Sequence, residues 1–229
     1  MDDLATSEAG AALSQAAPGL DLLAKGGFAI WVIAALSVAM LALVLWKSYR
    51  LFRLGAWERA RAEKAIAAWQ SGHAMGAIDA VEHRTGACAT LVHTAITALA
   101  DPRLSPDDAR AEVARIGRRQ VSDAQSGLRG LELIATVAPL LGLFGTVLGM
   151  IAAFQALESA GAQADPSTLA GGIWEALLTT AAGMAVAIPA SAALTWFEGV
   201  IESLRSDMED MATRLFTTPV EPPLARAAE

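Results

Sequence analysis

The stretch PSTLAGGIWEALLTTAAGMAVAIPASAALTWF, residues 166–197, decides the fold. It contains 32 residues but only one charged side chain, Glu175. A helix needs about 20 apolar residues to cross the hydrocarbon core of a bilayer. The stretch is therefore long enough for a membrane-spanning helix, which we predict over residues 172–197.

Two other stretches have the same character. Phe28 to Trp46 is a run of 19 residues without a charge, and 25 uncharged residues separate Glu132 from Glu158. A buried core helix can imitate one such run, but three in 229 residues favour a membrane protein. We predict further spans over 26–46 and 131–157. The expected fold is an all-α membrane protein, with three transmembrane helices and long cytoplasmic helical extensions.

The basic residues give the orientation. Of the 17 Lys and Arg residues, 13 lie between residues 47 and 130, and segment 158–171 has none. Because basic residues are retained in the cytoplasm, we expect 47–130 and 198–229 inside and 1–25 and 158–171 outside. Residues 1–25 are acidic and alanine-rich, which fits either a short helix on the outer surface or a loose tail. Their lack of a basic start argues against a cleaved signal peptide, so the first span should stay as an anchor.

Helices are also predicted outside the membrane. After Trp46 the sequence stays helical in character to about Trp69, Ser71-Gly72 marks a break, and 73–100 should form one or two helices. Ser105 suits an N-cap, and the proline after it suits the first position of the next helix.

The last two spans should belong to long helices. Nothing clearly stops a helix between Pro106 and about Leu157, although Pro139 is expected to kink it. The third span should run on to Phe216, with a kink expected at Pro189.

Glu175 is the most informative residue. An ionisable side chain deep in a membrane helix is costly and usually faces a bundle interior or a water-filled path. A carboxyl that gains and loses a proton would suit a proton relay. Alternatively, Glu175 lies at the outer interface, since it closely follows Gly171-Gly172.

Small residues recur beside this glutamate and in the second span. They let helices approach closely in membranes, but they can equally line a narrow pore, and both interpretations stay open here. A threonine in a span most often bonds its own helix backbone. The candidates for pore lining or helix packing are Gly142, Gly145 and Gly149 in the second span and Ala176, Thr179, Gly183 and Ala187 in the third.

Enzyme chemistry and cofactors are not expected. One cysteine, Cys88, excludes an internal disulfide and a four-cysteine zinc site. His73, His83 and His93 do not share a helical face, and no nucleophile elbow, nucleotide motif or metal-ligand spacing occurs. A net charge of −7 argues against a nucleic-acid partner. The basic residues between 47 and 64 suit either lipid head groups or an ordinary solvated helix.

Two blocks of sequence resemble a known family. APLLGLFGTVLGM (138–150) resembles the second-span signature of the ExbB/TolQ/MotA proton-channel family, and GIWEALLTTAAG (172–183), continued by AIPA (187–190), resembles its third-span signature. Both blocks match the ExbB and TolQ branch better than MotA. By position, Thr146, Glu175 and Thr180 match the polar residues along the family's proton path.

The resemblance implies an assembly. It implies a homopentamer in the bacterial inner membrane, with the N-terminus periplasmic and the C-terminus cytoplasmic. Its pore would enclose single-span ExbD- or TolR-like partners, and the proton-motive force would be passed to a TonB-like protein for outer-membrane uptake. The TolQ-like alternative serves envelope maintenance and division through a TolA-like protein. Gly171, Leu140 and Thr179 depart from the usual pattern and leave these branches unseparated. A passive membrane scaffold, with Glu175 as polar glue, is the alternative from another class.

Overall fold

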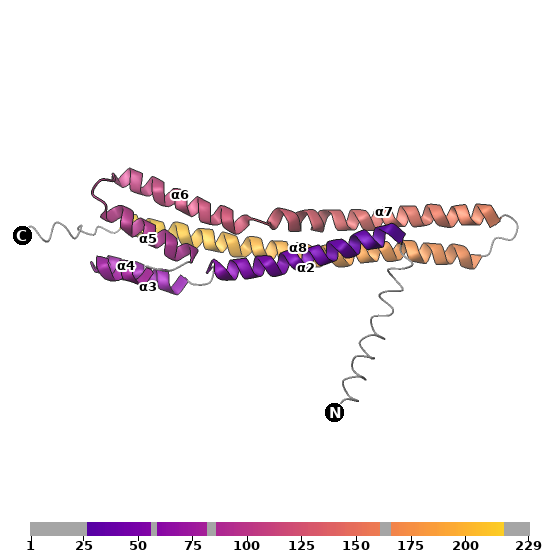
Figure 1. The fold of residues 1–229 in the computed structure, drawn as a ribbon, viewed down its shortest axis with the longest axis horizontal. Helices are drawn as coiled ribbons and strands as arrows, with labels where there is room; N and C mark the ends of the chain where they lie inside the picture. Colours follow the sequence, from indigo (N-terminus) through magenta and orange to yellow (C-terminus); the bar gives the residue numbers. More distant parts are fainter. Residues whose placement is uncertain (1–26, 56–58, 82–85, 161–165, 218–229) are drawn as a thin grey trace, which may run out of the picture. The chain divides into compact units, whose positions relative to one another are not determined.

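The computed structural model describes residues 27–55, 59–81, 86–160 and 166–217, and every regular element among them is a helix (Figure 1). The chain divides into two compact units, Met1–Leu43 with Arg129–Ala193 and Val44–Leu128 with Leu194–Glu229. The helices are α2 (Gly27–Arg53), α3 (Arg59–Gln70), α4 (Ala74–Val81), α5 (Ala87–Ala100), α6 (Pro106–Gln125), α7 (Leu128–Ala160) and α8 (Pro166–Thr217).

Three segments of the described chain are long and apolar enough to cross a membrane. They are Phe28–Arg53, Pro106–Ala160 and Leu169–Thr217, and the second comprises α6, a turn and α7. The prediction of an all-α membrane protein with three candidate spans is confirmed.

The first unit is built on close contact between α7 and α8. Small residues on α7 meet small residues on α8 in reverse order along the chain, so the two helices pack antiparallel. The first turns of α2 join this contact, because a Cβ added at Gly145 would lie 3.0 Å from Cβ of Ala29. Many large apolar side chains on the outer sides of these helices are exposed, such as Val38, Leu140 and Ile188, as expected of a membrane-facing surface.

The second unit has a conventional hydrophobic core. Helices α3, α4 and α5 pack with one another, with α6 and with the ends of α2 and α8, and apart from Met75 on α4 their large apolar side chains are shielded from solvent. Ion pairs connect α3 to α8: Arg214 meets Glu63 at 2.9 Å, and Arg59 meets Asp207. The largest side chains buried in this unit include Leu51, Ile66, Leu91, Ile96, Phe197, Leu204, Met211 and Leu215.

The expectation of one helix from Pro106 to about Leu157 is wrong. The helix stops at Gln125 and a new one begins at Leu128. Gly127 takes a φ of +87°, a left-handed conformation that favours glycine. The Lys47 ammonium group donates hydrogen bonds to the carbonyl oxygens of Ala124 and Ser126. It thus replaces the backbone N–H donors that these oxygens would meet if the helix continued. Contacts with a distant helix therefore fix a break that glycine alone does not specify.

The expectation of helix from Trp46 to Trp69 also needs correction. Helix α2 ends at Arg53, a turn with Gly55 at φ +60° follows, and α3 begins at Arg59. Again a glycine in the left-handed region ends the helix. Two helices, α4 and α5, occupy the range 73–100, which is one of the two alternatives expected there.

Other boundaries agree with the sequence. Ser71-Gly72 forms a turn, and the Ser105 side chain caps α6 by accepting a hydrogen bond from the backbone N–H of Asp108 at 3.1 Å. Helix α8 reaches Thr217. Pro139 and Pro189 lie inside the continuous helices α7 and α8. Residues 1–26 and most of the tail, 218–229, lie outside the described residues.

Candidate functional site

Glycines on α7 and α8 allow the two helix backbones to touch. A Cβ added at Gly142 would lie 3.0 Å from O of Thr179, and one added at Gly149 would lie 2.9 Å from Cβ of Ala176. On α8, a Cβ added at Gly183 would lie 2.5 Å from O of Ala138. Side chains larger than hydrogen do not fit at these positions without movement.

Two hydroxyl groups join the helices at the centre of this contact. Thr180 Oγ1 donates to the carbonyl oxygen of Gly142 at 3.1 Å. Thr179 Oγ1 lies 3.2 Å from the same oxygen and 2.7 Å from O of Ala176. Thr179 is only 3% exposed, so its hydroxyl needs these acceptors. The hydroxyl of Thr179, a residue that departs from the family's usual pattern, is therefore satisfied within the subunit.

Glu175 lines a groove beside this contact. The groove has a volume of about 450 Å³ and is formed by α2, α7 and α8. Gly145, Gly149 and Gly172 lie along it, and Phe28 and Ala29 of α2 close one side. Among the described residues that line the groove, Glu175 is the one ionisable side chain. The glycines leave the space that the groove occupies.

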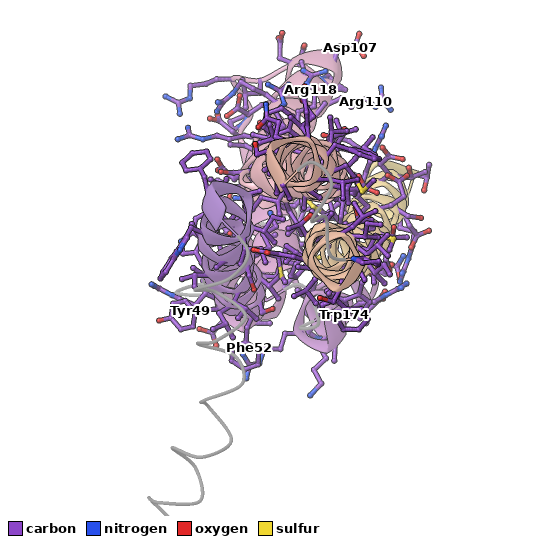
Figure 2. The ribbon with its side chains drawn as sticks, turned by 90° about the vertical axis from the view of Figure 1, so that its right-hand side faces the viewer. Tyr49, Phe52, Asp107, Arg110, Arg118 and Trp174 are labelled. Carbon is purple, nitrogen blue, oxygen red and sulfur yellow. The ribbon has the colours of Figure 1, made fainter. Side chains whose placement is uncertain are left out.

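The carboxylate of Glu175 is half-buried and has no hydrogen bond or ion pair with another described residue. The side of α8 away from the groove is apolar: Trp174 is 70% exposed and Leu177 60%. Figure 2 shows Trp174 projecting from α8 on the side away from α7. An unneutralised carboxylate in such a segment needs water, a proton or an outside partner.

The structure brings only some of the predicted residues together. Ala176, Thr179, Gly183 and Ala187 are buried inside the first unit, and Gly142, Gly145 and Gly149 lie in the α7–α8 contact. Thr146 donates its hydroxyl to O of Leu143 at 2.6 Å, within its own helix. Thr146 and Thr180 do not line the groove of Glu175.

The sequence matches the MotA/TolQ/ExbB proton channel family over residues 83–210, more than half of the chain. The chain belongs to this family. The signature blocks at 138–150 and 172–190 lie inside the matched range.

Relatives from both named branches are similar to this member of the family. The biopolymer transport protein ExbB of Xanthomonas campestris is 29% identical over 204 residues, which cover 82% of this chain and 80% of the relative. The biopolymer transport protein exbB1 of Vibrio cholerae is 49% identical over 29% of each chain. The Tol-Pal system protein TolQ of Pseudomonas aeruginosa is 40% identical, covering 47% of this chain and 46% of TolQ. This chain thus matches less than two thirds of the Vibrio and Pseudomonas proteins.

Sequence reasoning missed the part that α2 plays in this family member. Phe28 and Ala29 line the groove of Glu175, but an apolar residue at the start of a span gives no sign of which neighbour it meets. It also missed Lys47, which is 3% exposed. The sequence signals the role of Lys47 only indirectly. The last turn of α6 has no basic residue, so the carbonyl end of α6 lacks a cation from its own helix and can accept one from elsewhere.

Metal and thiol chemistry find no support in the described part of the chain. No group of three or more His, Cys, Asp or Glu side chains is placed to hold a metal ion there. Cys88 is buried in α5, and burial, with a smaller contribution from Asp207, raises the pKa of its thiol to about 11. His73 lies on the surface and contacts Ser71, and His83 lies outside the described residues.

Proposed function

We propose that this chain is an ExbB-like subunit of a proton-driven motor in the bacterial inner membrane. Through an ExbD-like single-span partner, the subunit would couple the proton-motive force to a TonB-like protein that powers uptake across the outer membrane. The chain does no covalent chemistry in this role and needs no cofactor.

One observation carries the proposal. Glu175 is a carboxylate without a partner among the described residues, within an apolar membrane segment, and it faces a groove rather than the apolar outer side of α8. Maintaining such a group costs free energy, and a group that exchanges protons gives a reason for that cost. The family resemblance assigns the same residue to the proton path.

Thr146 and Thr180 are proposed as the neighbouring hydroxyls on that path. Each donates its proton to a backbone carbonyl, but each oxygen can still accept a hydrogen bond. Water could therefore be ordered beside them. The buried small residues Ala176, Gly183 and Ala187 would serve the path indirectly, by holding α7 and α8 together.

The proposed setting follows from charge and from the relatives. Because 13 of 17 basic residues lie between 47 and 130, the proposed orientation has the N-terminus in the periplasm and the C-terminus in the cytoplasm. A homopentamer enclosing the single-span partners is proposed from the family resemblance. Exposed apolar side chains such as Leu143 and Leu177 are available for neighbouring subunits, partner helices or lipid.

The test is Glu175→Gln, which keeps the size and hydrogen-bonding capacity of the side chain but cannot release a proton. We expect loss of energy-dependent uptake with normal assembly of the complex. Glu198→Gln, an exposed position on the same helix, is the matched control and should leave uptake intact. If Glu175→Gln supports uptake, the proton-path role is wrong and the passive scaffold is favoured, since glutamine still serves as polar glue.

A TolQ-like role in envelope maintenance and division is the second candidate, because the Pseudomonas TolQ is 40% identical over nearly half of this chain. Complementation separates the two roles. Rescue of an uptake-deficient strain supports the ExbB-like role, whereas rescue of a detergent-sensitive strain alone supports the TolQ-like role.

A further inference from the structure

A second groove lies in the second unit, far along the sequence from Glu175. It has a volume of about 910 Å³ and is formed mainly by α6 and the end of α8. We call it the α6–α8 groove and define it by Val113, Gly117 and Val121 of α6 and Met208, Ala212 and Phe216 of α8. The proposed proton path gives this groove no role.

The groove has the pattern of a slot for a helix. On α6, Arg110, Val113, Gly117 and Val121 follow one another at spacings of three, four and four residues. On α8, Arg205, Met208, Ala212 and Phe216 repeat the same spacings. Such spacings place each set on a single helical face. Two helical stripes that line one groove can receive the face of a third helix.

Small side chains keep the slot open. Because Gly117 has no side chain, Leu91 and Met208 form the floor of the groove beside it. Their nearest atoms would lie 3.4 Å and 3.9 Å from a Cβ added at Gly117. Val113, Leu91 and Met208 form a buried apolar base. The lining of α6 runs from Arg110 to Gln125, about 22 Å at 1.5 Å per residue. This length matches about four turns of a bound helix.

The charged groups on the rim favour an acidic occupant. Three arginines line the groove against a single carboxylate, Glu209. Arg205 bonds Glu209 at 2.9 Å, and Arg110 bonds Asp107 at 3.3 Å. Arg118 has no carboxylate partner among the described residues. Figure 2 labels Arg110 and Arg118 on the same side of its end-on view, and both residues line the groove.

We propose that the α6–α8 groove binds an acidic amphipathic helix from another protein. Its apolar face would lie on the partly exposed Gly117, Val121 and Ala212, above the buried base, and a carboxylate would pair with Arg118. A lipid head group is a poorer fit, because the groove residues of α8 come 8 to 20 positions after the predicted end of the third span at residue 197.

The test uses the complete chain, assembled in nanodiscs, and a fluorescent 14-residue peptide as the probe. The peptide carries leucine and alanine at helical i, i+3, i+4 and i+7 positions and glutamate elsewhere, and a second peptide replaces every glutamate with lysine. We expect saturable binding of the acidic peptide, measured by anisotropy, and at least tenfold weaker binding of the basic one. Equal binding of the two peptides, or none, overturns the proposal.

Matched variants locate the binding site. Arg118→Glu should weaken binding of the acidic peptide at least tenfold. Arg119→Glu makes the same charge change at the next residue, outside the groove lining, and should change binding less than twofold. Gly117→Leu should block the floor, whereas Gly117→Ala should bind normally and shows that the fold tolerates substitution. Equal effects of Arg118→Glu and Arg119→Glu would show a nonspecific charge effect and overturn the proposal.

The remaining occupants are separated by one more variant. A chain ending at Thr217 lacks the 12 residues that follow the groove. If only this shortened chain binds the acidic peptide, the chain's own tail fills the groove and an outside partner is excluded. If the complete chain binds no peptide in the assembled complex but binds it when dissociated, a second copy of the chain covers the groove, and the proposal is again overturned.

Discussion

At Gly183, the absence of a single methyl group allows α7 and α8 to touch. An added Cβ would lie 2.5 Å from the carbonyl oxygen of Ala138 and 3.1 Å from Cα of Gly142. Both are backbone atoms, so the helices themselves would have to move apart. The same close approach brings Thr180 Oγ1 within reach of the Gly142 carbonyl oxygen.

Gly183→Ala should therefore lower the stability of the protein, by about 1–3 kcal/mol as for other overpacked sites. Gly199→Ala is the control: it lies in the same helix, and a Cβ there would meet nothing within 4 Å. It should be neutral or stabilise by about 0.5–1 kcal/mol, because alanine favours helix over glycine. Melting temperatures of the purified variants in detergent test both, and equal values would contradict the packing described for α7 and α8.

Cys88 should be chemically quiet. Its thiol has a pKa raised to about 11 by burial, so the reactive thiolate is scarce near neutral pH, and access is limited as well. At pH 7.5 we expect Cys88 to react with a maleimide roughly a hundredfold more slowly than an exposed thiol. Met75→Cys, at a position 83% exposed, supplies the comparison within the same chain. Similar labelling rates at the two positions in the folded protein would show that α5 does not bury Cys88.

Among the elements, the junction of α6 and α7 depends on α2. Lys47 donates to the carbonyl oxygens of Ala124 and Ser126, and Arg50 donates to the Ser126 hydroxyl at 3.2 Å. The ring of Trp46 packs on Gly127, where an added Cβ would lie 2.5 Å from Cζ3. A cation at the carbonyl end of a helix also interacts favourably with the helix dipole.

Lys47→Met should loosen this junction, because it leaves the buried carbonyl oxygen of Ala124 without this donor, at a cost of about 1–3 kcal/mol. The readout is hydrogen exchange of the backbone amides between residues 121 and 130, which we expect to accelerate. Lys64→Met, at an exposed position on α3, removes the same charge and should leave exchange in this segment unchanged. Unchanged exchange in Lys47→Met would show that the turn does not need the lysine.

The helices were predictable to different degrees. Long apolar runs predicted α2, α7 and α8, and the cap residue Ser105 predicted the start of α6. Both signals can be read from neighbouring residues in the sequence, without knowing any distant contact. The break at Gly127 was not predictable, because a glycine in a helical sequence is tolerated more often than it ends a helix. What fixes the break is Lys47, some 80 residues earlier. For the same reason the sequence identified Glu175 but not the groove around it, which needs Phe28 and Ala29 of α2.

At the scale of the whole molecule, the distribution of charge predicts its orientation in the membrane. Alkaline phosphatase, which is active only in the periplasm, should be active when inserted between residues 161 and 165 and inactive when fused after Glu229. The basis is the lack of basic residues in 158–171 and their concentration in 47–130. A green fluorescent protein fused at the same two positions should show the reverse pattern. Phosphatase activity at the C-terminus would invert the proposed topology.

The central claim is that Glu175 carries protons, and proton flux measures it most directly. The chain and its single-span partner would be reconstituted in liposomes containing a pH-sensitive dye, and a pH gradient or potential imposed. We predict flux for the unchanged protein and for Glu198→Gln, and a loss to the background of empty liposomes for Glu175→Gln with the complex intact. Flux through the Glu175→Gln complex at the level of the unchanged protein would contradict the account.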